Sequence, residues 1–311
     1  EVMAGDSNFD LWMPRDYNIP NSIPYLRPLD DLPYINLDAE WWFPQASEIF
    51  KFNGAQYGAT SYFSLSPISR AAGIVFNEDL YANLGAEMSP YEYVYQNKWT
   101  LATFYELCKL AVDDLNGDGK MDENDDRYGI IATPTRHYSA LLMGAGVRYI
   151  DRDADGALYF AIDGNEYAQS VMAKFVALDL ENKDIYTNKK ADINVDINTV
   201  FTDGRAMFCA AYGGEAAKMR GLEFDIGFVP APKFDANQEN YYSLVEGGAQ
   251  SVLPRMLDEN DLTKIGTILD AFAYYSYYES IPAYIDVLIM GKVARNEDSE
   301  EMLQLVFDTS A

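Results

Sequence analysis

The chain has 311 residues, of which 49% are hydrophobic and 14% aromatic, and its formal net charge is -26. This apolar content can supply a sizeable core, and the length predicts two lobes or domains rather than one. The excess of acidic residues argues against a nucleic-acid partner and against direct docking on anionic lipid. No run of apolar residues approaches the ~18 that a membrane span needs.

The first part of the chain predicts short strands separated by loops. Asn53-Gly54 is a hairpin signal between two strand-like segments. The expected elements are the strand Phe9–Met13, a loop-rich segment from Pro14 to Pro44, the strand pair Glu48–Phe52 and Gln56–Tyr62, the strand Gly73–Asn77 and the helix Glu78–Leu84.

From Thr100 onward, strands and helices alternate, which indicates an α/β architecture. Thr100 stands at the N-cap of a helix whose apolar residues follow helical spacing. The later expected strands are Tyr128–Ala132, Ala157–Phe160, Ala206–Ala210, Asp225–Val229 and Ser251–Pro254, and the later helices are Tyr138–Gly144, Glu166–Glu181, Asn198–Asp203, Lys264–Ser280, Pro282–Ile289 and Glu300–Phe307. Cys108 and Cys209 each lie in an apolar segment, so we expect two buried free thiols rather than a disulfide.

The segment from Asp114 to Asp125 has the ligand spacing of a twelve-residue calcium loop. Side-chain oxygens stand at positions 1, 3, 5, 9 and 12, Gly119 allows the sharp turn at position 6, and a carbonyl serves position 7. We therefore predict a structural Ca²⁺ ion held by Asp114, Asn116, Asp118, Lys120, Asp122 and Asp125. Position 12 is Asp where a bidentate Glu is usual, so the site should be tighter or weaker than usual. The alternative is a solvated acidic turn, because Asn-Gly and Asp-Gly are strong turn formers.

A second acidic segment, from Asp151 to Gly156, resembles half of such a loop. Ile162 stands at its position 12, where an acid is needed. We therefore interpret this segment as a polar hairpin turn.

Most catalytic constellations have no support in this sequence. His137 is the only histidine, which removes most Ser-His-Asp and Cys-His arrangements and histidine-based zinc sites. No glycine-rich nucleotide-binding motif follows a strand. A glycosidase needs only two suitably spaced carboxylates, but among so many acidic residues no pair stands out.

Several segments, taken in their order along the chain, match one pattern. They are Met3-Ala4-Gly5-Asp6 with Phe9-Asp10-Leu11, then Tyr25–Leu32, Gly73–Leu80, Trp99-Thr100 with Phe104, Phe201–Phe208, Asp225–Lys233, and Pro282-Ala283-Tyr284 through Glu301-Met302-Leu303. Together they resemble the extracellular solute-binding proteins of ABC transporters, of the large carbohydrate-binding kind. Members of that family add a lipoprotein signal, the first βαβ unit of lobe one and C-terminal helices, so we expect this chain to be an internal piece of a longer protein.

The resemblance implies a two-lobe α/β fold of the periplasmic-binding-protein type (type II), with the ligand cleft between the lobes. Lobe one would comprise residues 1–71 and 246–292, lobe two residues 72–245, and residues 293–311 would begin the return to lobe two. The implied function is that of a monomeric, non-enzymatic receptor that closes around an oligosaccharide or other small solute and delivers it to the permease subunits of an ABC importer. It would be extracellular, as a cell-surface lipoprotein anchored outside this fragment, or periplasmic.

A sugar site needs aromatic platforms and hydrogen-bonding side chains. In the family, the loop that starts at Trp12 faces the cleft. The candidate ligand-binding residues are Trp12, Arg15, Asp16, Trp42, Tyr62, Arg136, His137, Tyr138, Tyr212 and Glu246. For the pair Trp41-Trp42, at most one ring would normally face the ligand, and core packing is the alternative. We expect the tyrosines from Tyr274 to Tyr278 to serve packing and surface rather than sugar binding.

Two other classes of function remain open from the sequence. A calcium-dependent glycan-cleaving enzyme would use the abundant carboxylates and aromatics. A surface adhesion or sensory module would bind a glycan through a calcium bridge. Product release distinguishes the first from a receptor, and loss of binding in a chelator distinguishes the second.

Overall fold

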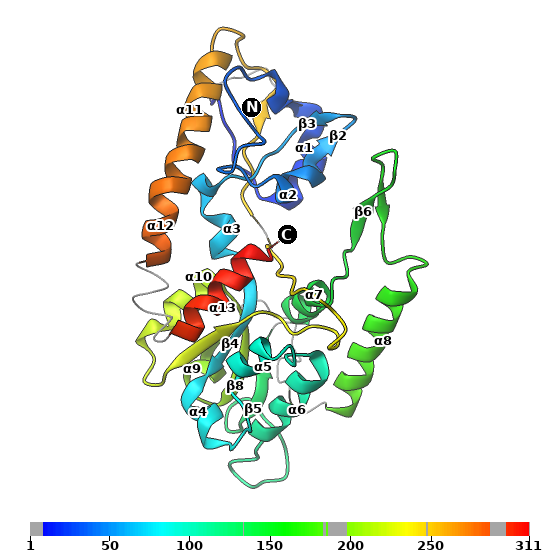
Figure 1. Ribbon diagram of the computed structural model, residues 1–311, viewed down its shortest axis with the longest axis vertical. Helices are drawn as coiled ribbons and strands as arrows, with labels where there is room; N and C mark the ends of the chain where they lie inside the picture. Colours follow the sequence, from blue (N-terminus) through cyan, green and yellow to red (C-terminus); the bar gives the residue numbers. More distant parts are fainter. Residues whose placement is uncertain are drawn as a thin grey trace. The chain divides into compact units, whose positions relative to one another are not determined.

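The structure, a computed structural model, describes residues 9–132, 134–182, 185, 198–246, 248–286 and 297–310. Contacts within the chain divide it into two compact units (Figure 1). Unit 1 is drawn from Glu1–Ala71 and Val245–Leu288, and unit 2 from Ala72–Leu244 and Ile289–Ser310. Both units therefore combine segments that are far apart in the sequence.

Unit 1 consists of short elements, many loops and one long helical stretch. Its first part contains η2 (Asp16–Asn18), α1 (Ile19–Ser22), η3 (Ile23–Tyr25), β1 (Leu26–Arg27), η4 (Leu29–Asp31), α2 (Pro44–Ser47), η5 (Glu48–Phe50), β2 (Lys51–Phe52), β3 (Ala55–Gln56), η6 (Tyr62–Ser64) and α3 (Ser66–Ser69). Its second part contains β10 (Leu253–Pro254), α11 (Leu262–Tyr275), the π-helix η8 (Ser276–Ser280) and α12 (Ile281–Tyr284). β1 pairs antiparallel with β10 and joins the two parts.

The hairpin predicted at Asn53-Gly54 is confirmed, although its strands are shorter than expected. β2 and β3 pair antiparallel. Asn53 has φ 51° and Gly54 has φ 81°. Positive φ at both central residues is what a two-residue type I′ turn requires.

Three extended segments of unit 1 lie side by side. Trp12 pairs antiparallel with Val252, and the neighbouring Ser251 pairs antiparallel with Ala59. The strand predicted for Phe9–Met13 is reduced to an isolated bridge at Trp12. Pro14, which has no N–H, interrupts the ladder between this bridge and the next one, which pairs Arg15 with Ala249.

Buried side chains from both parts of the chain form the core of unit 1. The main cluster includes Leu29, Leu32, Trp42, Leu253, Leu262 and Leu269. Asp270 of α11 fixes the loop that precedes α2: one carboxylate oxygen accepts hydrogen bonds from the indole N–H groups of Trp41 at 3.0 Å and Trp42 at 2.9 Å. The same oxygen accepts the amide of Asn36 at 3.3 Å.

Unit 2 contains a four-stranded sheet in the order β5-β8-β4-β9, with helices around it (Figure 1). β5 and β8 are parallel, and the other two pairs are antiparallel. Its elements are β4 (Ala72–Asn77), α4 (Glu78–Asn83), α5 (Pro90–Tyr95), α6 (Leu101–Ala111), β5 (Tyr128–Ile131), α7 (Pro134–Gly144), β6 (Ile150–Arg152), β7 (Leu158–Phe160), α8 (Glu166–Glu181), α9 (Asn198–Thr202), β8 (Ala206–Tyr212), α10 (Gly213–Ala216), η7 (Ala217–Gly221), β9 (Ile226–Val229) and α13 (Glu297–Asp308).

The strands of this sheet are buried along their whole length, as in sheets covered on both faces. They confirm four of the strands predicted from the sequence. The predicted helices α4, α6 and α8 are also confirmed, and each begins at a side chain that accepts a backbone amide of the first turn: Asn77, Thr100 and Asn165 respectively.

The helix α5 is not among the expected elements, although its start signal is present. Ser89 and Glu92 form a capping box, in which each side chain accepts the other residue's amide, and Pro90 takes the first helical position. The hydroxyl of Tyr91 shares a hydrogen bond of 2.5 Å with that of Ser299. This hydrogen bond connects α13 to α5 within unit 2.

Aromatic rings fill the core of unit 2 around Phe208 of β8. The ring of Phe208 lies 5.1 Å from that of Phe104 and 6.0 Å from that of Trp99. Cys108 and Cys209 are buried free thiols, which confirms that prediction. In the described part of the chain, no helix is long and apolar enough to cross a membrane.

Candidate functional site

The candidate residues near the start of unit 1 stand on one edge of its extended segments. The backbone of Trp12 exchanges two hydrogen bonds with Val252, at 3.1 and 3.0 Å. The amide of Asp16 donates to the carbonyl of Gly248 at 3.0 Å. Trp12 is 39% exposed, Arg15 is exposed and Asp16 is half-buried. The Trp12 ring, the Arg15 guanidinium and the Asp16 carboxylate therefore reach solvent within five residues whose backbone is paired with the segment from Gly248 to Val252.

Glu246 lies next to this edge. Its amide donates to the carbonyl of Arg70 at 3.4 Å, and the Arg70 side chain donates back to the Glu246 carbonyl at 2.8 Å. Gly247, which follows it, lies outside the described residues. The side chain of Glu246 is half-buried, and it stands two residues before the carbonyl that receives Asp16.

Tyr62 belongs to a group of aromatic residues on unit 1 that the sequence analysis did not assemble. Its ring lies 6.2 Å from Phe43 and 5.2 Å from Tyr277. Next to it, Phe63 stacks on Phe272 of α11 at 4.9 Å, and both rings are exposed. The sequence signal for this group is the aromatic density from Phe272 to Tyr278, of which the tyrosines from Tyr274 to Tyr278 are predicted to serve packing and surface.

Trp42 does not suit the ligand-binding role predicted for it. It is 2% exposed, belongs to the core cluster of unit 1 and donates its indole N–H to Asp270. With both ring faces packed, it offers no platform to a sugar. The alternative reading of this residue, core packing, is the correct one.

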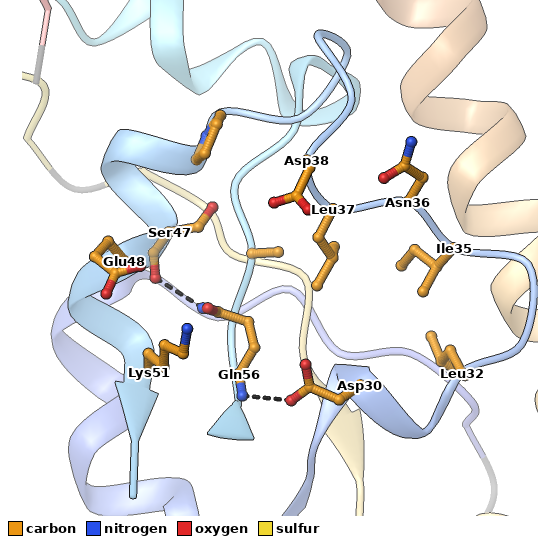
Figure 2. Close-up of a pocket in the computed structure, with 12 residues that line it drawn as sticks. Asp30, Leu32, Ile35, Asn36, Leu37, Asp38, Ser47, Glu48, Lys51 and Gln56 are labelled. Atoms are coloured by element: carbon orange, nitrogen blue, oxygen red, sulfur yellow. Dashed lines mark hydrogen bonds between the residues drawn. The ribbon is translucent and has the colours of Figure 1, made fainter. Parts of the chain in front are cut away.

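Unit 1 also contains a cavity of about 420 Å³ between the loop after η4 and the segment from α2 to β3 (Figure 2). Apolar side chains (Leu32, Ile35 and Leu37) and charged ones (Asp30, Asp38, Glu48 and Lys51) line it. Gln56 connects the two sides of this cavity. Its backbone N–H donates to the Asp30 carboxylate at 2.6 Å, and its side-chain amide donates to the Ser47 carbonyl at 2.8 Å. No aromatic side chain among the described residues lines this cavity, so it lacks a stacking platform for a sugar.

In unit 2, the carboxylate of Asp179 binds the candidate residue Tyr138 of α7. Asp179, on α8, accepts a hydrogen bond from the hydroxyl of Tyr138 on one oxygen and from that of Tyr105 on the other, the latter at 2.5 Å. The hydroxyl of Tyr105 also lies 3.4 Å from Nε2 of His137. Tyr138 remains 39% exposed, whereas Tyr105 is buried.

Burial sets the protonation of this group. It lowers the pKa of His137 to about 4, against a smaller opposing effect of the Asp179 carboxylate. Burial, reinforced by the bond to Asp179, raises the pKa of Tyr138 to about 12 and raises that of Tyr105 as well. At neutral pH the imidazole is therefore uncharged and both phenols carry their protons.

Two residues predicted to contact the ligand from unit 2 are buried instead. His137 is 3% exposed, and Tyr212 is 4% exposed in a cluster with Ala72 and Ala140. Packing against neighbouring elements, which the local pattern does not reveal, turns these rings inward. The side chain of Arg136 lies outside the described part of the structure.

In the loop predicted to bind calcium, side-chain oxygens accept hydrogen bonds from backbone amides of the same loop. Asp114 accepts the amides of Gly117 and Gly119, both at 2.7 Å, and Asp118 accepts that of Lys120 at 2.8 Å. Asn116 and Asp122 each accept an amide two residues on, at 2.9 and 2.7 Å. The glycines have φ 73° and 82°.

Asp126, one residue beyond the predicted ligands, closes the base of this loop. It is fully buried and accepts the amides of Leu115 at 2.9 Å and Asp122 at 2.7 Å. Among the described residues, no three His, Cys, Asp or Glu side chains come together closely enough to hold a metal ion. The loop has the oxygen ligands that calcium prefers, and both oxygens of Asp114 and one each of Asn116, Asp118 and Asp122 accept backbone amides.

No protein-family model matches the sequence, and no curated protein matches it. Solved structures do match. The maltose/maltodextrin-binding domain MalE from Bdellovibrio bacteriovorus, bound to maltotriose, is similar over 99% of this chain and 74% of its own, with a TM-score of 0.61 and 16% identity. Maltose-bound T. maritima MalE3 is similar over 99% of this chain and 75% of its own, with a TM-score of 0.61 and 16% identity. The ABC substrate-binding protein Lmo0181 from Listeria monocytogenes, in complex with cycloalternan, is similar over 99% of this chain and 75% of its own, with a TM-score of 0.61 and 13% identity. The chain has the fold of the ABC-transporter solute-binding proteins.

This solute-binding-protein fold confirms the predicted fold class, an α/β fold of two lobes. At identities of 13–16%, the similarity establishes the fold and leaves the ligand to be argued from side chains. Trp12, Arg15 and Asp16 lie within five consecutive residues of unit 1, where Trp12 and Arg15 are exposed, and Tyr138 is exposed on unit 2.

Proposed function

We propose that this protein is the extracellular substrate-binding component of an ABC importer and captures a carbohydrate, an oligosaccharide in particular. The observation that carries the proposal is the fold, shared over 99% of the chain with proteins whose bound ligands are maltotriose, maltose and cycloalternan. Permease subunits of the importer would be its protein partner. A lipid anchor outside this chain would hold it at the cell surface.

The exposed chemistry of unit 1 supports a sugar as the ligand. Sugar rings present apolar C–H faces and hydroxyl edges, so they suit an aromatic ring flanked by charged hydrogen-bonding groups. Trp12 supplies such a ring, and Arg15 and Asp16 supply a donor and an acceptor next to it. The backbone of this segment is already paired at Trp12 with Val252 and at Asp16 with Gly248 without the ligand, which lowers the ordering cost of binding.

Calorimetric titration with maltotriose, cyclic glucans, free sugars and short peptides tests this function. We expect saturable binding of one glycan per chain and recovery of that glycan intact. Cleaved glycan would instead support the enzyme, and a peptide as the sole ligand would contradict the carbohydrate assignment.

Replacing the aromatic platform should weaken glycan binding. We expect Trp12→Ala to raise the Kd at least about tenfold, because a stacked aromatic contact typically contributes more than about 1.4 kcal/mol. Tyr17→Ala is the matched control, since Tyr17 is an even more exposed aromatic residue a few positions away. An affinity of Trp12→Ala equal to that of the unmodified protein would remove Trp12 from the site.

We also propose that the loop from Asp114 to Asp125 binds a structural calcium ion. Its alternating side-chain oxygens, already curved around the two positive-φ glycines, support this. A carboxylate that accepts a backbone amide keeps further lone pairs for an ion, so these hydrogen bonds are compatible with calcium ligation. The loop joins α6 to β5, so calcium would act on the stability of unit 2 rather than on a ligand directly.

Calcium should raise the melting temperature in a way that depends on Asp118. At a concentration of about 100 Kd a bound ion adds about 2.7 kcal/mol, which corresponds to a shift of roughly 5 °C. Asp118→Ala should abolish the difference between calcium and chelator. Asp153→Ala, at the turn of the β6–β7 hairpin, should preserve it. Identical melts of the unmodified protein in calcium and in chelator would rule out the site.

A further inference from the structure

Asp179 connects three helices of unit 2 through its two carboxylate oxygens. One oxygen receives the hydroxyl of Tyr105 from α6, and the other receives that of Tyr138 from α7. Asp179 itself stands near the C-terminal end of α8. Phenol-to-carboxylate hydrogen bonds are charge-assisted and are among the stronger ones in proteins. Both hydroxyls are therefore fixed by this one side chain.

The direction of the hydrogen bonds follows from the donors. Tyr105 gives its proton to Asp179, so its oxygen can meet Nε2 of His137 only by accepting an N–H. The imidazole ring also packs edge-on against the ring of Tyr138, with centroids 5.3 Å apart and planes inclined by 66°. Tyr138 is thus held at its hydroxyl by Asp179 and along its ring by His137.

The three rings of this cluster differ in what they offer to a solute. Tyr105 and His137 are buried, while 39% of Tyr138 remains exposed. An exposed tyrosine ordinarily satisfies its hydroxyl with water and samples several rotamers. Here the hydroxyl is fixed from within the protein, which leaves the ring available and immobile. A preformed platform of this kind improves affinity by reducing the entropy lost on binding.

We infer that Asp179 is a positioning residue: it holds the ring of Tyr138 as a stacking surface for the sugar. This inference rests on the proposed function for its ligand, and on the described geometry for the placement of the ring. Asn at position 179 would keep a single acceptor oxygen for two phenols. The two phenols use different oxygens of Asp179, and the amide nitrogen that replaces one of them in Asp179→Asn cannot accept a hydroxyl proton. The phenol on that side loses its acceptor, and the more exposed Tyr138 is the one that water can satisfy.

A double-mutant cycle with maltotriose as the probe tests the inference. We expect Asp179→Asn and Tyr138→Phe each to weaken binding about fivefold to tenfold, because each removes the bond that fixes the ring. In the Tyr138→Phe background, Asp179→Asn should change the affinity less than twofold. Asp163→Asn removes an equal charge from an exposed position of unit 2 and should leave the affinity unchanged. Additive losses, or no loss in Asp179→Asn, would overturn the positioning role.

A ligand-free measurement separates this inference from the proposed function. In NMR spectra of protein with ring-¹³C tyrosine, the Cζ resonance of Tyr138 is identified by its absence from Tyr138→Phe. We expect Asp179→Asn to move it toward the values of freely exposed tyrosines, and Asp163→Asn to leave it in place. If the unmodified protein binds none of the sugars, the proposed function fails while this result still decides the placement. An unmoved resonance in Asp179→Asn would overturn the inference even where sugar binding is found.

Discussion

Acidification from pH 7 to pH 4 should remove about 3 kcal/mol from the free energy of unfolding through His137 alone. In the unfolded chain this histidine takes up a proton near its ordinary pKa of 6.5, whereas in the folded protein burial lowers the pKa to about 4. Between these values the unfolded state binds more protons. The neutral imidazole therefore contributes its full stability above pH 6.5, and that stability is lost as the pH falls toward 4.

Denaturant unfolding at pH 7, 5.5 and 4 measures this effect. Many carboxylates also titrate below pH 5, so the informative quantity is the difference between the unmodified protein and His137→Gln. We expect this variant, which cannot gain a charge, to lose about 3 kcal/mol less over the range. Parallel pH profiles for the two proteins would show that His137 is solvated in the folded state.

Removing the carboxylate of Asp270 should destabilise unit 1 by about 3 kcal/mol. A single oxygen of Asp270 accepts the indole N–H groups of Trp41 and Trp42. Hydrogen bonds to a charged acceptor contribute about 1.5–3 kcal/mol each, and Trp42 is too deeply buried for water to replace its acceptor. Asp270→Ala therefore leaves a buried donor unsatisfied and frees the loop that precedes α2 from α11.

Asp270→Asn is the matched control for this prediction. It keeps one side-chain oxygen for the two indoles and loses only the charge, so its destabilisation should be less than half that of Asp270→Ala. Chemical denaturation followed by tryptophan fluorescence reports both variants, because the two indoles are among the chain's four tryptophans. Equal losses for Ala and Asn would show that charge, rather than the acceptor, is what matters.

Local patterns predicted the secondary structure of unit 2 well, because its elements carry complete signals. The strand β4 is a continuous apolar run, and α8 has both an N-cap at Asn165 and a regular buried stripe. The same helix-start signals also predict α5, because its capping box, Ser89 with Glu92, can be recognised from the sequence. Unit 1 was harder, since Pro14 and its neighbours break the strands into isolated bridges that depend on distant partners.

Candidate ligand-binding residues were harder to predict than elements. Trp12 and Tyr138 are exposed, but Trp42, His137 and Tyr212 are buried. Whether an aromatic ring faces solvent depends on what packs over it, and those partners come from other parts of the chain. Asp270 covers Trp42 from more than two hundred residues away. Asp179 had no local signal at all, because its importance arises from two phenols on other helices.

The two buried thiols give this protein a built-in probe. Cys108 and Cys209 are its only cysteines, and both belong to unit 2. A thiol-reactive dye therefore labels the chain only when unit 2 opens, and stays silent when unit 1 alone unfolds. Labelling rates can follow the local opening of one half of the molecule without any engineered residue.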